Sequence, residues 1–185
     1  MKRILAMVLA VVLLSGCGSA DTEMKTAMEL REMLLSTQSC SFDTEINADF
    51  GDKLYSFSMK CEFDRDGSMT FTVIAPETIA GITGSVSYAG GKLTFDKSAL
   101  AFSLLADGEV SPVSAPWLVM KALRGGYLTA CGAEGDLLRL TIDDSYEEDA
   151  MQSDIWIKGH TPQYAEVVWQ GRRILTLSIE NFQLL

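Results

Sequence analysis

The sequence contains one histidine, His160, and no pair of cysteines with CxxC spacing. A single histidine cannot supply a histidine-cluster metal site, and without CxxC the usual sign of a metal or redox site is missing. The motifs GxSxG and HExxH and a glycine-rich phosphate loop are absent as well. We therefore expect no catalytic residues, no metal and no cofactor. We interpret His160 as a solvated residue in a turn between two strands.

Positive charge is also scarce, with 15 Lys and Arg against 25 Asp and Glu and a formal net charge of −10. Such a surface repels nucleic acid and anionic lipid headgroups, so we expect no nucleic-acid partner. The densest acidic run, Asp143–Asp149, lacks the alternating spacing and central glycine of an EF-hand loop. We interpret this run as a solvated loop.

Long hydrophobic runs are limited to the N-terminus, where Ile4–Leu14 gives eleven apolar residues after Lys2 and Arg3. A membrane-spanning helix needs about 20 residues, so this run is too short to span a bilayer but suits a secretory signal peptide. No other run approaches that length. We expect the rest of the chain to form a water-soluble body.

The residues Leu14-Ser15-Gly16-Cys17 match the bacterial lipobox at all four positions, so residues 1–16 resemble a lipoprotein signal peptide. The resemblance implies that cleavage leaves Cys17 at the new N-terminus and that its thiol carries diacylglycerol, with palmitate among the expected acyl chains. The alternative is an ordinary secreted protein with a free cysteine near its cleavage site. Removing 16 of the 185 residues leaves 169, enough for one domain, and changes the formal charge from −10 to −12.

We expect residues 17–22 to be the lipidated N-terminus and a short polar tether, and residues 23–185 to form a single domain. Because no polybasic patch is present, attachment to the membrane has to come from the acyl chains. A helix should follow the tether, since Asp21 or Thr22 can cap it and neither Gly nor Pro occurs in residues 22–37.

After Gln38 apolar and polar residues alternate, which is typical of half-buried antiparallel strands. We expect strands and hairpins over 40–48, 54–63, 68–75, 82–96, 127–143, 154–159, 163–171 and 172–184, and a short helix over 111–124. This order predicts one α+β domain with an N-terminal helix, many antiparallel strands and one helical insertion.

The helix leading into Ser39–Phe42, the meander, the mid-chain helix and the closing segment Gln163–Phe182 together resemble the bacterial lipoprotein-carrier family. This LolA/LolB-like family has relatives among mycobacterial and clostridial lipoproteins. The resemblance implies a strongly curved antiparallel sheet, an incomplete barrel, closed by the N-terminal and mid-chain helices. It also implies an apolar concave face that can receive acyl chains.

The alternating strands and the two helices offer residues for such a face. We predict a ligand-lining set of Phe42, Ile46, Tyr55, Phe57, Met59, Phe71, Trp117 and Met120. Met24 and Met28 of the first helix should also point into the concavity. Nine methionines suit an adaptable apolar lining. The alternative is that these side chains pack against each other as a filled core.

Cys40 and Cys61 fall on the apolar faces of two consecutive strands. A four-residue loop at 49–52 would place them directly opposite each other, whereas a two-residue Gly51-Asp52 turn would place them diagonally. Alternation alone does not decide between these registers, so a cross-strand disulfide and two buried free thiols both stay open.

The sequence thus predicts an extracytoplasmic lipoprotein, anchored to the cell membrane through Cys17, that binds or handles a hydrophobic ligand such as a lipid or acyl chain. The alternative is a non-enzymatic scaffold or partner protein for an envelope or spore-wall enzyme. A cavity of about 300–1,000 Å³ between sheet and helices would favour ligand binding, and a packed interior would favour the scaffold.

Overall fold

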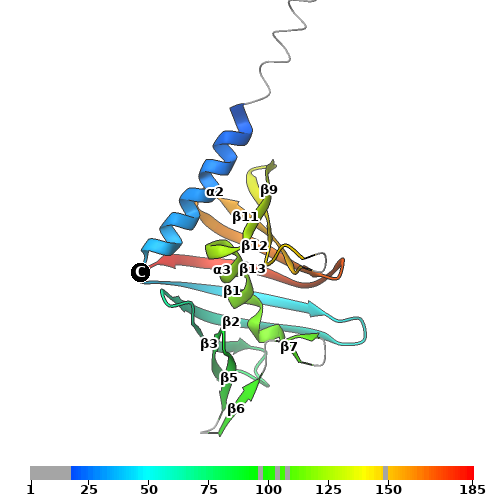
Figure 1. Cartoon of the computed structure of the whole chain (residues 1–185). Coiled ribbons are helices and arrows are strands. Elements are labelled where there is room, and N and C mark those ends of the chain that lie inside the picture. The colour runs from blue at the N-terminus through cyan, green and yellow to red at the C-terminus, as the bar shows by residue number, and fades with distance from the viewer. Residues whose placement is uncertain (1–17, 96–97, 103–104, 107–108, 148–149) are drawn as a thin grey trace, which may run out of the picture.

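The computed structural model describes residues 18–95, 98–102, 105–106, 109–147 and 150–185 (Figure 1). The predicted signal peptide and the lipidation site Cys17 lie outside the described residues. Within these ranges the helices are α2 (Gly18–Ser36) and α3 (Ala115–Gly125), the latter following a 3-10 turn at Pro112–Ser114. The strands are β1 (Ser39–Asp49), β2 (Leu54–Asp64), β3 (Met69–Ala75), β4 (Thr83–Ser87), β5 (Gly90–Phe95), β6 (Ser98–Phe102), β7 (Leu105–Ala106), β8 (Glu109–Val110), β9 (Tyr127–Glu134), β10 (Leu137–Asp143), β11 (Gln152–Lys158), β12 (Thr161–Trp169) and β13 (Arg172–Leu184).

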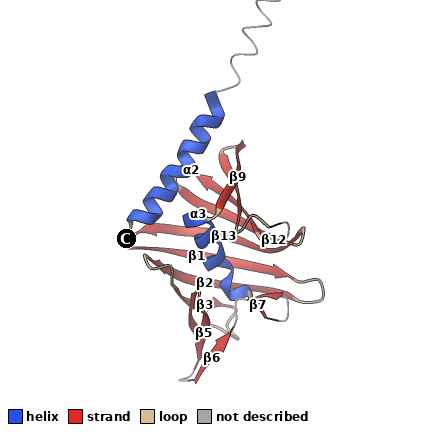
Figure 2. Ribbon diagram, in the orientation of Figure 1, coloured by secondary structure: helices blue, strands red, loops and turns tan. Residues whose placement is uncertain are grey.

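Eleven of the strands form one antiparallel sheet in the order β6-β5-β4-β3-β2-β1-β13-β12-β11-β10-β9, and β7 pairs with β8. The strands β1 and β13 are neighbours in the middle of this sheet, although they lie at opposite ends of the chain order. The sheet is curved, and its edge strands β6 and β9 do not pair with each other (Figures 1 and 2). The predicted α+β architecture, an incomplete barrel with two helices, is confirmed.

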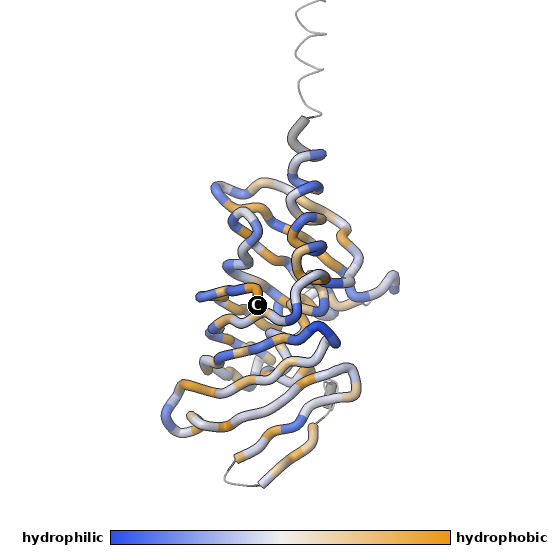
Figure 3. The backbone as a smooth tube through the Cα atoms, turned by 90° about the vertical axis from the view of Figure 1, so that its left-hand side faces the viewer, coloured by the Kyte–Doolittle hydropathy of each residue, from blue (hydrophilic) through white to orange (hydrophobic). Residues whose placement is uncertain are grey.

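The N-terminal helix starts earlier than the sequence predicted. Helix α2 already includes residues 18–22, which we expected to be a polar link, because no Gly or Pro interrupts the helix after Gly18. It extends beyond the sheet with Gly18 at its outer end (Figures 1 and 3). Its buried residues follow the expected helical spacing and are Ala27, Leu30 and Leu34.

The strands place their apolar residues on the inner, concave face of the sheet. Along β1 every second residue from Cys40 to Ala48 is buried, and the residues between them are partly or fully exposed. Figure 3 shows this alternation of hydrophobic and hydrophilic residues along the strands. Burial of one large apolar side chain contributes about 1.5–3 kcal/mol, so this face supplies the main driving force for folding.

Helix α3 covers the concave face and packs on β2, β10, β11, β12 and β13 (Figure 2). The indole Nε1 of its buried Trp117 donates a hydrogen bond to the carbonyl oxygen of Gly67 in the β2–β3 turn. At the C-terminus of α3, the guanidinium of Arg31 in α2 donates hydrogen bonds to the carbonyl oxygens of Leu123 and Gly126, at 2.8 and 2.9 Å. These bonds satisfy carbonyl groups that a helix end leaves without partners. Both ends of α3 are therefore fixed to other elements.

A glycine in β4 allows close packing on the same face. Gly84 lies opposite Phe71 in β3, and a Cβ at Gly84 would come within 2.5 Å of the Phe71 ring and 2.6 Å of the carbonyl oxygen of Lys92. The ring of Phe71 therefore lies directly against the backbone of β4, and only 3% of Phe71 is exposed.

Candidate functional site

Most of the predicted ligand-lining residues lie in the packed core between the sheet and α3. Seven of the eight are at most 7% exposed: Phe42, Ile46, Phe57, Met59, Phe71, Trp117 and Met120. They form one continuous core with the inner residues of β10 to β13. The structure therefore brings these side chains together on the concave face, where they contact one another.

Three apolar residues assigned to the concavity lie elsewhere. Tyr55 is 45% exposed at the β1–β2 hairpin end, where its ring lies 6.2 Å from that of Phe50. Met24 and Met28 are 41% and 48% exposed, because Ala27 and Leu30 form the buried face of α2 instead. Helical spacing predicted an apolar stripe correctly but did not indicate which edge of the stripe faces the sheet.

Among the hollows that described residues border, the one between α3 and the β10–β11 region is small. A hollow of about 100 Å³ lies between α3 and the β10–β11 region, lined by Leu118, Ala122 and Met151 among others. Pockets for small molecules usually measure about 300–1,000 Å³. Of the eight predicted lining residues, Tyr55 and Phe71 border hollows of the described part of the chain, and both of these hollows lie outside the core.

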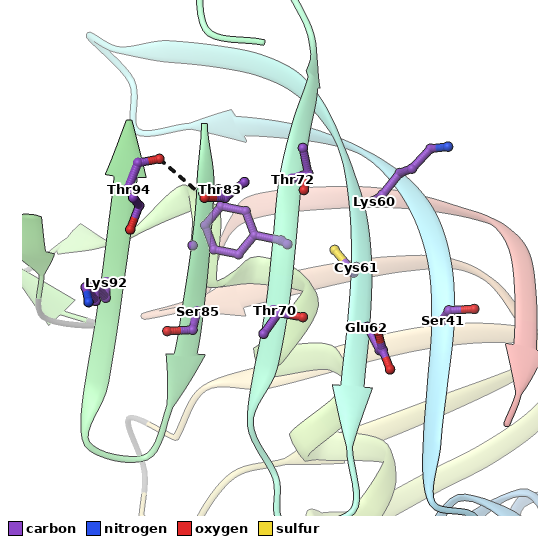
Figure 4. A pocket seen from close by; sticks show the side chains of 12 residues that line it. Ser41, Lys60, Cys61, Glu62, Thr70, Thr72, Thr83, Ser85, Lys92 and Thr94 are labelled. Carbon is purple, nitrogen blue, oxygen red and sulfur yellow. Dashed lines mark hydrogen bonds between the residues drawn. The ribbon is translucent and has the colours of Figure 1, made fainter. Parts of the chain in front are cut away.

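Larger hollows lie on the outer, convex face of the sheet. One of about 620 Å³ crosses β1 to β5 and is lined mainly by hydroxyl and charged side chains (Figure 4). Thr72, Thr83 and Thr94 stand in one row across it, with Lys60 at the end of the row. A second hollow of about 600 Å³ lies beside the β1–β2 hairpin and β13. The second hollow has a mixed lining, in which apolar residues such as Leu54, Tyr55 and Ile174 stand beside polar ones such as Asn47 and Arg173.

The outer face also carries a polar and aromatic cluster over β10 to β13. Asp154 is 4% exposed, and its carboxylate accepts hydrogen bonds from Arg139 (2.8 Å) and Thr141 (2.7 Å). The Arg139 guanidinium lies 5.2 Å from the ring centre of Trp156. The ring centres of Trp156 and Tyr164 are 5.3 Å apart. The Asp154 carboxylate raises the pKa of Arg139 by hydrogen bonding. Sequence reasoning missed this cluster, because its residues come from separate strands.

A further hollow of about 260 Å³ opens beside the last turns of α3, and we call it the rim hollow. It is lined by Leu35, Phe63, Arg65, Asp66, Gly67, Tyr88, Lys121, Arg124 and Gly125. The amine of Lys121 lies 5.8 Å from the ring centre of Tyr88, and the guanidinium of Arg124 lies 5.2 Å from that of Phe63. Three cations thus gather in one place on an acidic protein.

The two strand cysteines are buried free thiols in the structure. Cys40 lies opposite Phe63 and Cys61 lies opposite Phe42, so the register is that of the Gly51-Asp52 turn, and direct opposition of the cysteines is wrong. Diagonal positions lie about 7–8 Å apart, beyond ordinary disulfide geometry. Burial raises the pKa of the Cys40 thiol to about 12 and also raises the pKa of Cys61.

His160 contacts α2 rather than solvent alone, since its Nε2 lies 3.1 Å from Oε2 of Glu29. In the acidic run, Asp143 ends β10 and Asp144 accepts a hydrogen bond from the backbone amide of Met151, while residues 148–149 lie outside the described residues. In the part of the chain that the structure describes, no cluster of three His, Cys, Asp or Glu side chains could hold a metal ion. None of the described helices is long and apolar enough to cross a membrane.

No family model and no curated protein matches the chain. Among solved structures it is similar to the LolA superfamily protein NE2245 from Nitrosomonas europaea, at 11% identity and a TM-score of 0.47 over 88% of this chain and 93% of that one. It is also similar to a putative outer membrane lipoprotein-sorting protein domain from Vibrio parahaemolyticus, at 8% identity and a TM-score of 0.49 over 90% and 93%.

A third similar chain comes from the structure of the CwlD amidase from Clostridioides difficile in complex with the GerS lipoprotein, at 10% identity and a TM-score of 0.46 over 88% of this chain and 96% of that one. LolA-superfamily and lipoprotein-sorting proteins are thus among the structural neighbours of this chain. Because the overlap is loose in each case, the function argued below rests on the residues of this chain.

Proposed function

We propose that this protein is an extracytoplasmic lipoprotein, tethered through Cys17, that serves as a non-enzymatic binding partner for another protein of the cell envelope. The observation that supports this function best is the filled concave face. The hollow beside α3 measures about 100 Å³, and seven of the eight residues that would line an acyl-chain pocket are buried against each other.

Entry of a hydrophobic ligand would require α3 to leave the sheet. Trp117, Val119, Met120 and Leu123 are each at most 3% exposed. Exposing them costs about 1.5–3 kcal/mol per side chain, or about 6–12 kcal/mol in total. The whole stability of a domain is about 5–15 kcal/mol, so a guest would have to compete with folding itself. Binding through the surface carries no such cost.

The outer surface suits a protein partner. Trp156, Tyr164 and Arg139 are partly exposed on one side of the sheet, and these residue types are enriched at protein interfaces. Each of the three donates a hydrogen bond to a carboxylate, Arg139 to Asp154, Tyr164 to Glu166 and Trp156 to Glu134, so little side-chain freedom is lost when a partner binds.

The function can be tested with the full chain isolated from membranes in detergent. We expect native mass spectrometry to show no non-covalently bound lipid, and in-cell crosslinking to recover one protein in stoichiometric amount. A co-purifying lipid that is lost from Trp117→Ala, but retained by Trp156→Ala as the surface control, would instead establish a carrier.

The tether is tested separately. We expect mass spectrometry of the N-terminal peptide to find Cys17 acylated. We also expect Cys17→Ala to move the protein from the membrane fraction to the soluble fraction. Retention of the Cys17→Ala chain on membranes would contradict attachment through this residue.

A further inference from the structure

We propose that the rim hollow is the docking site for an acidic segment of the protein partner. This inference rests on the proposed function and adds a docking site that is separate from the outer-face residues Arg139, Trp156 and Tyr164. The hollow combines an apolar wall with three cations, Arg65, Lys121 and Arg124.

The cations of the rim hollow are not neutralised within the protein. None of the three forms an ion pair with another described residue, although exposed acidic groups elsewhere pair with Lys25, Lys158 and Arg172. Arg124 donates to the carbonyl oxygens of Asp64 and Arg65 at 3.0 and 2.6 Å, and its Nε is buried without a partner. Asp66 is the one carboxylate on the wall. The hollow therefore keeps an excess of positive charge.

The same hollow has aromatic and aliphatic walls that are open to solvent. Tyr88 is 68% exposed and Leu35 is 48% exposed. The Tyr88 ring is held edge-on to Trp117 with ring centres 5.1 Å apart, and Lys121 lies within 6 Å of both rings. A rigid aromatic side chain beside a cation is typical of residues that dominate interface energies.

The positive charge of the rim hollow indicates which kind of segment binds there. The protein carries a formal charge of −10, so a second copy is repelled, while an acidic segment would be attracted only where cations gather. An anionic lipid is negatively charged like an acidic segment, but its membrane lies far from the rim hollow. Leu35 of the hollow lies in the last turn of α2, and Gly18 lies at the other end of that helix. At 1.5 Å per residue these ends are about 25 Å apart, which separates the rim hollow from a membrane that holds the N-terminus.

The docking site can be tested on the full chain in phosphatidylcholine nanodiscs. The probe is a fluorescein-labelled octapeptide of alternating Glu and Phe, and its binding is followed by fluorescence anisotropy. We expect binding that weakens with added salt, and loss of binding when Lys replaces Glu in the peptide. The double variant Arg65→Glu/Lys121→Glu should lower the affinity about tenfold or more, and Arg65→Glu alone, in an exposed turn, about threefold.

The matched control is Lys92→Glu, which makes the same charge change in the hollow of the outer face. We expect it to change the affinity less than about twofold. Absence of peptide binding, or equal loss in the control, overturns the inference. Displacement of the peptide by dihexanoyl phosphatidylglycerol at submicellar concentration also overturns it, in favour of an anionic-lipid site.

The outcomes separate this inference from the proposed function. If the Arg65→Glu/Lys121→Glu chain still crosslinks its cellular partner in stoichiometric amount, the rim hollow is not the docking site and the proposed function stands. If lipid rather than protein accompanies the unmodified chain, the proposed function itself fails.

Discussion

Trp117 of α3 and Gly67 of the β2–β3 turn are joined by a hydrogen bond of 2.8 Å between the indole Nε1 and the carbonyl oxygen. The two residues are 50 positions apart in the chain. Tyr88 covers the same indole from the β4–β5 turn. One side chain thus connects the helix on the concave face with two turns of the sheet, and its removal should loosen both.

The first prediction concerns this indole. Trp117→Phe removes the hydrogen bond and leaves a small cavity, so we expect the free energy of unfolding to fall by about 2–4 kcal/mol. Trp156→Phe, in the half-exposed cluster of the outer face, should cost about 1 kcal/mol or less. Urea denaturation of both variants measures the difference, and equal losses would mean that α3 does not depend on Trp117.

Arg31 provides a second test of how α3 is held. Arg31→Met keeps the aliphatic stem but removes the donors to Leu123 and Gly126. We expect a loss of about 1–3 kcal/mol and faster amide hydrogen exchange near the C-terminus of α3. Arg172→Met breaks an exposed pair with Asp49 and should cost at most about 1 kcal/mol. Unchanged exchange in Arg31→Met would show that the helix end holds without this residue.

The buried thiols predict a decrease in stability at alkaline pH. Burial raises the pKa of Cys40 to about 12 and raises that of Cys61, whereas the unfolded thiols ionise near 9.0. The folded state therefore keeps its protons above pH 9 and the unfolded state loses them. The stabilisation is complete below pH 9 and is lost as the pH rises towards 12, by at most about 1.4 kcal/mol per pH unit for each thiol.

Urea denaturation at pH 7.5, 9 and 10 measures this slope. The variant Cys40→Ala/Cys61→Ala should lose the contribution of both thiols. Cys131→Ala, which removes a partly buried thiol, should keep most of it. A slope that is the same in all three chains would assign the pH dependence to other groups.

Asp154 tests the cluster on the outer face. Asp154→Ala leaves the Arg139 guanidinium without its buried acceptor, and we expect a loss of about 2–4 kcal/mol. Asp136→Ala removes an acceptor from Lys158 in a pair that is exposed on both sides, and should change stability little. Thermal unfolding of the two variants compares them, and equal melting temperatures would contradict a structural role for Asp154.

Sequence reasoning reached the fold because alternation and helical spacing act locally. The period-two pattern from Cys40 to Ala48 identified the inner face of β1 correctly, and the proline-marked entry placed the mid-chain helix near α3. The register between β1 and β2 could not be predicted, because the four-residue loop and the two-residue turn both keep Cys40 and Cys61 on the apolar face.

The candidate sites could be predicted much less well. A strand pattern shows that a face is apolar but not whether a guest, a helix or its own side chains cover it. The rim hollow takes Arg65 from a turn, Lys121 from α3 and Tyr88 from another turn. No spacing in the sequence relates these positions, because only the curved sheet brings them together.

The pairing of β1 with β13 has a consequence for how the protein is made. Cys40, near the start of β1, pairs with Leu184, near the end of the chain. The β1–β13 pair lies in the middle of the sheet. The strands β2 to β6 and β9 to β12 can meander locally, but within the sheet the two arms join through the pairing of β1 with β13. We expect the chain to remain open until residues 172–184 have emerged, and an open chain is the form in which a protein can be threaded through an export channel.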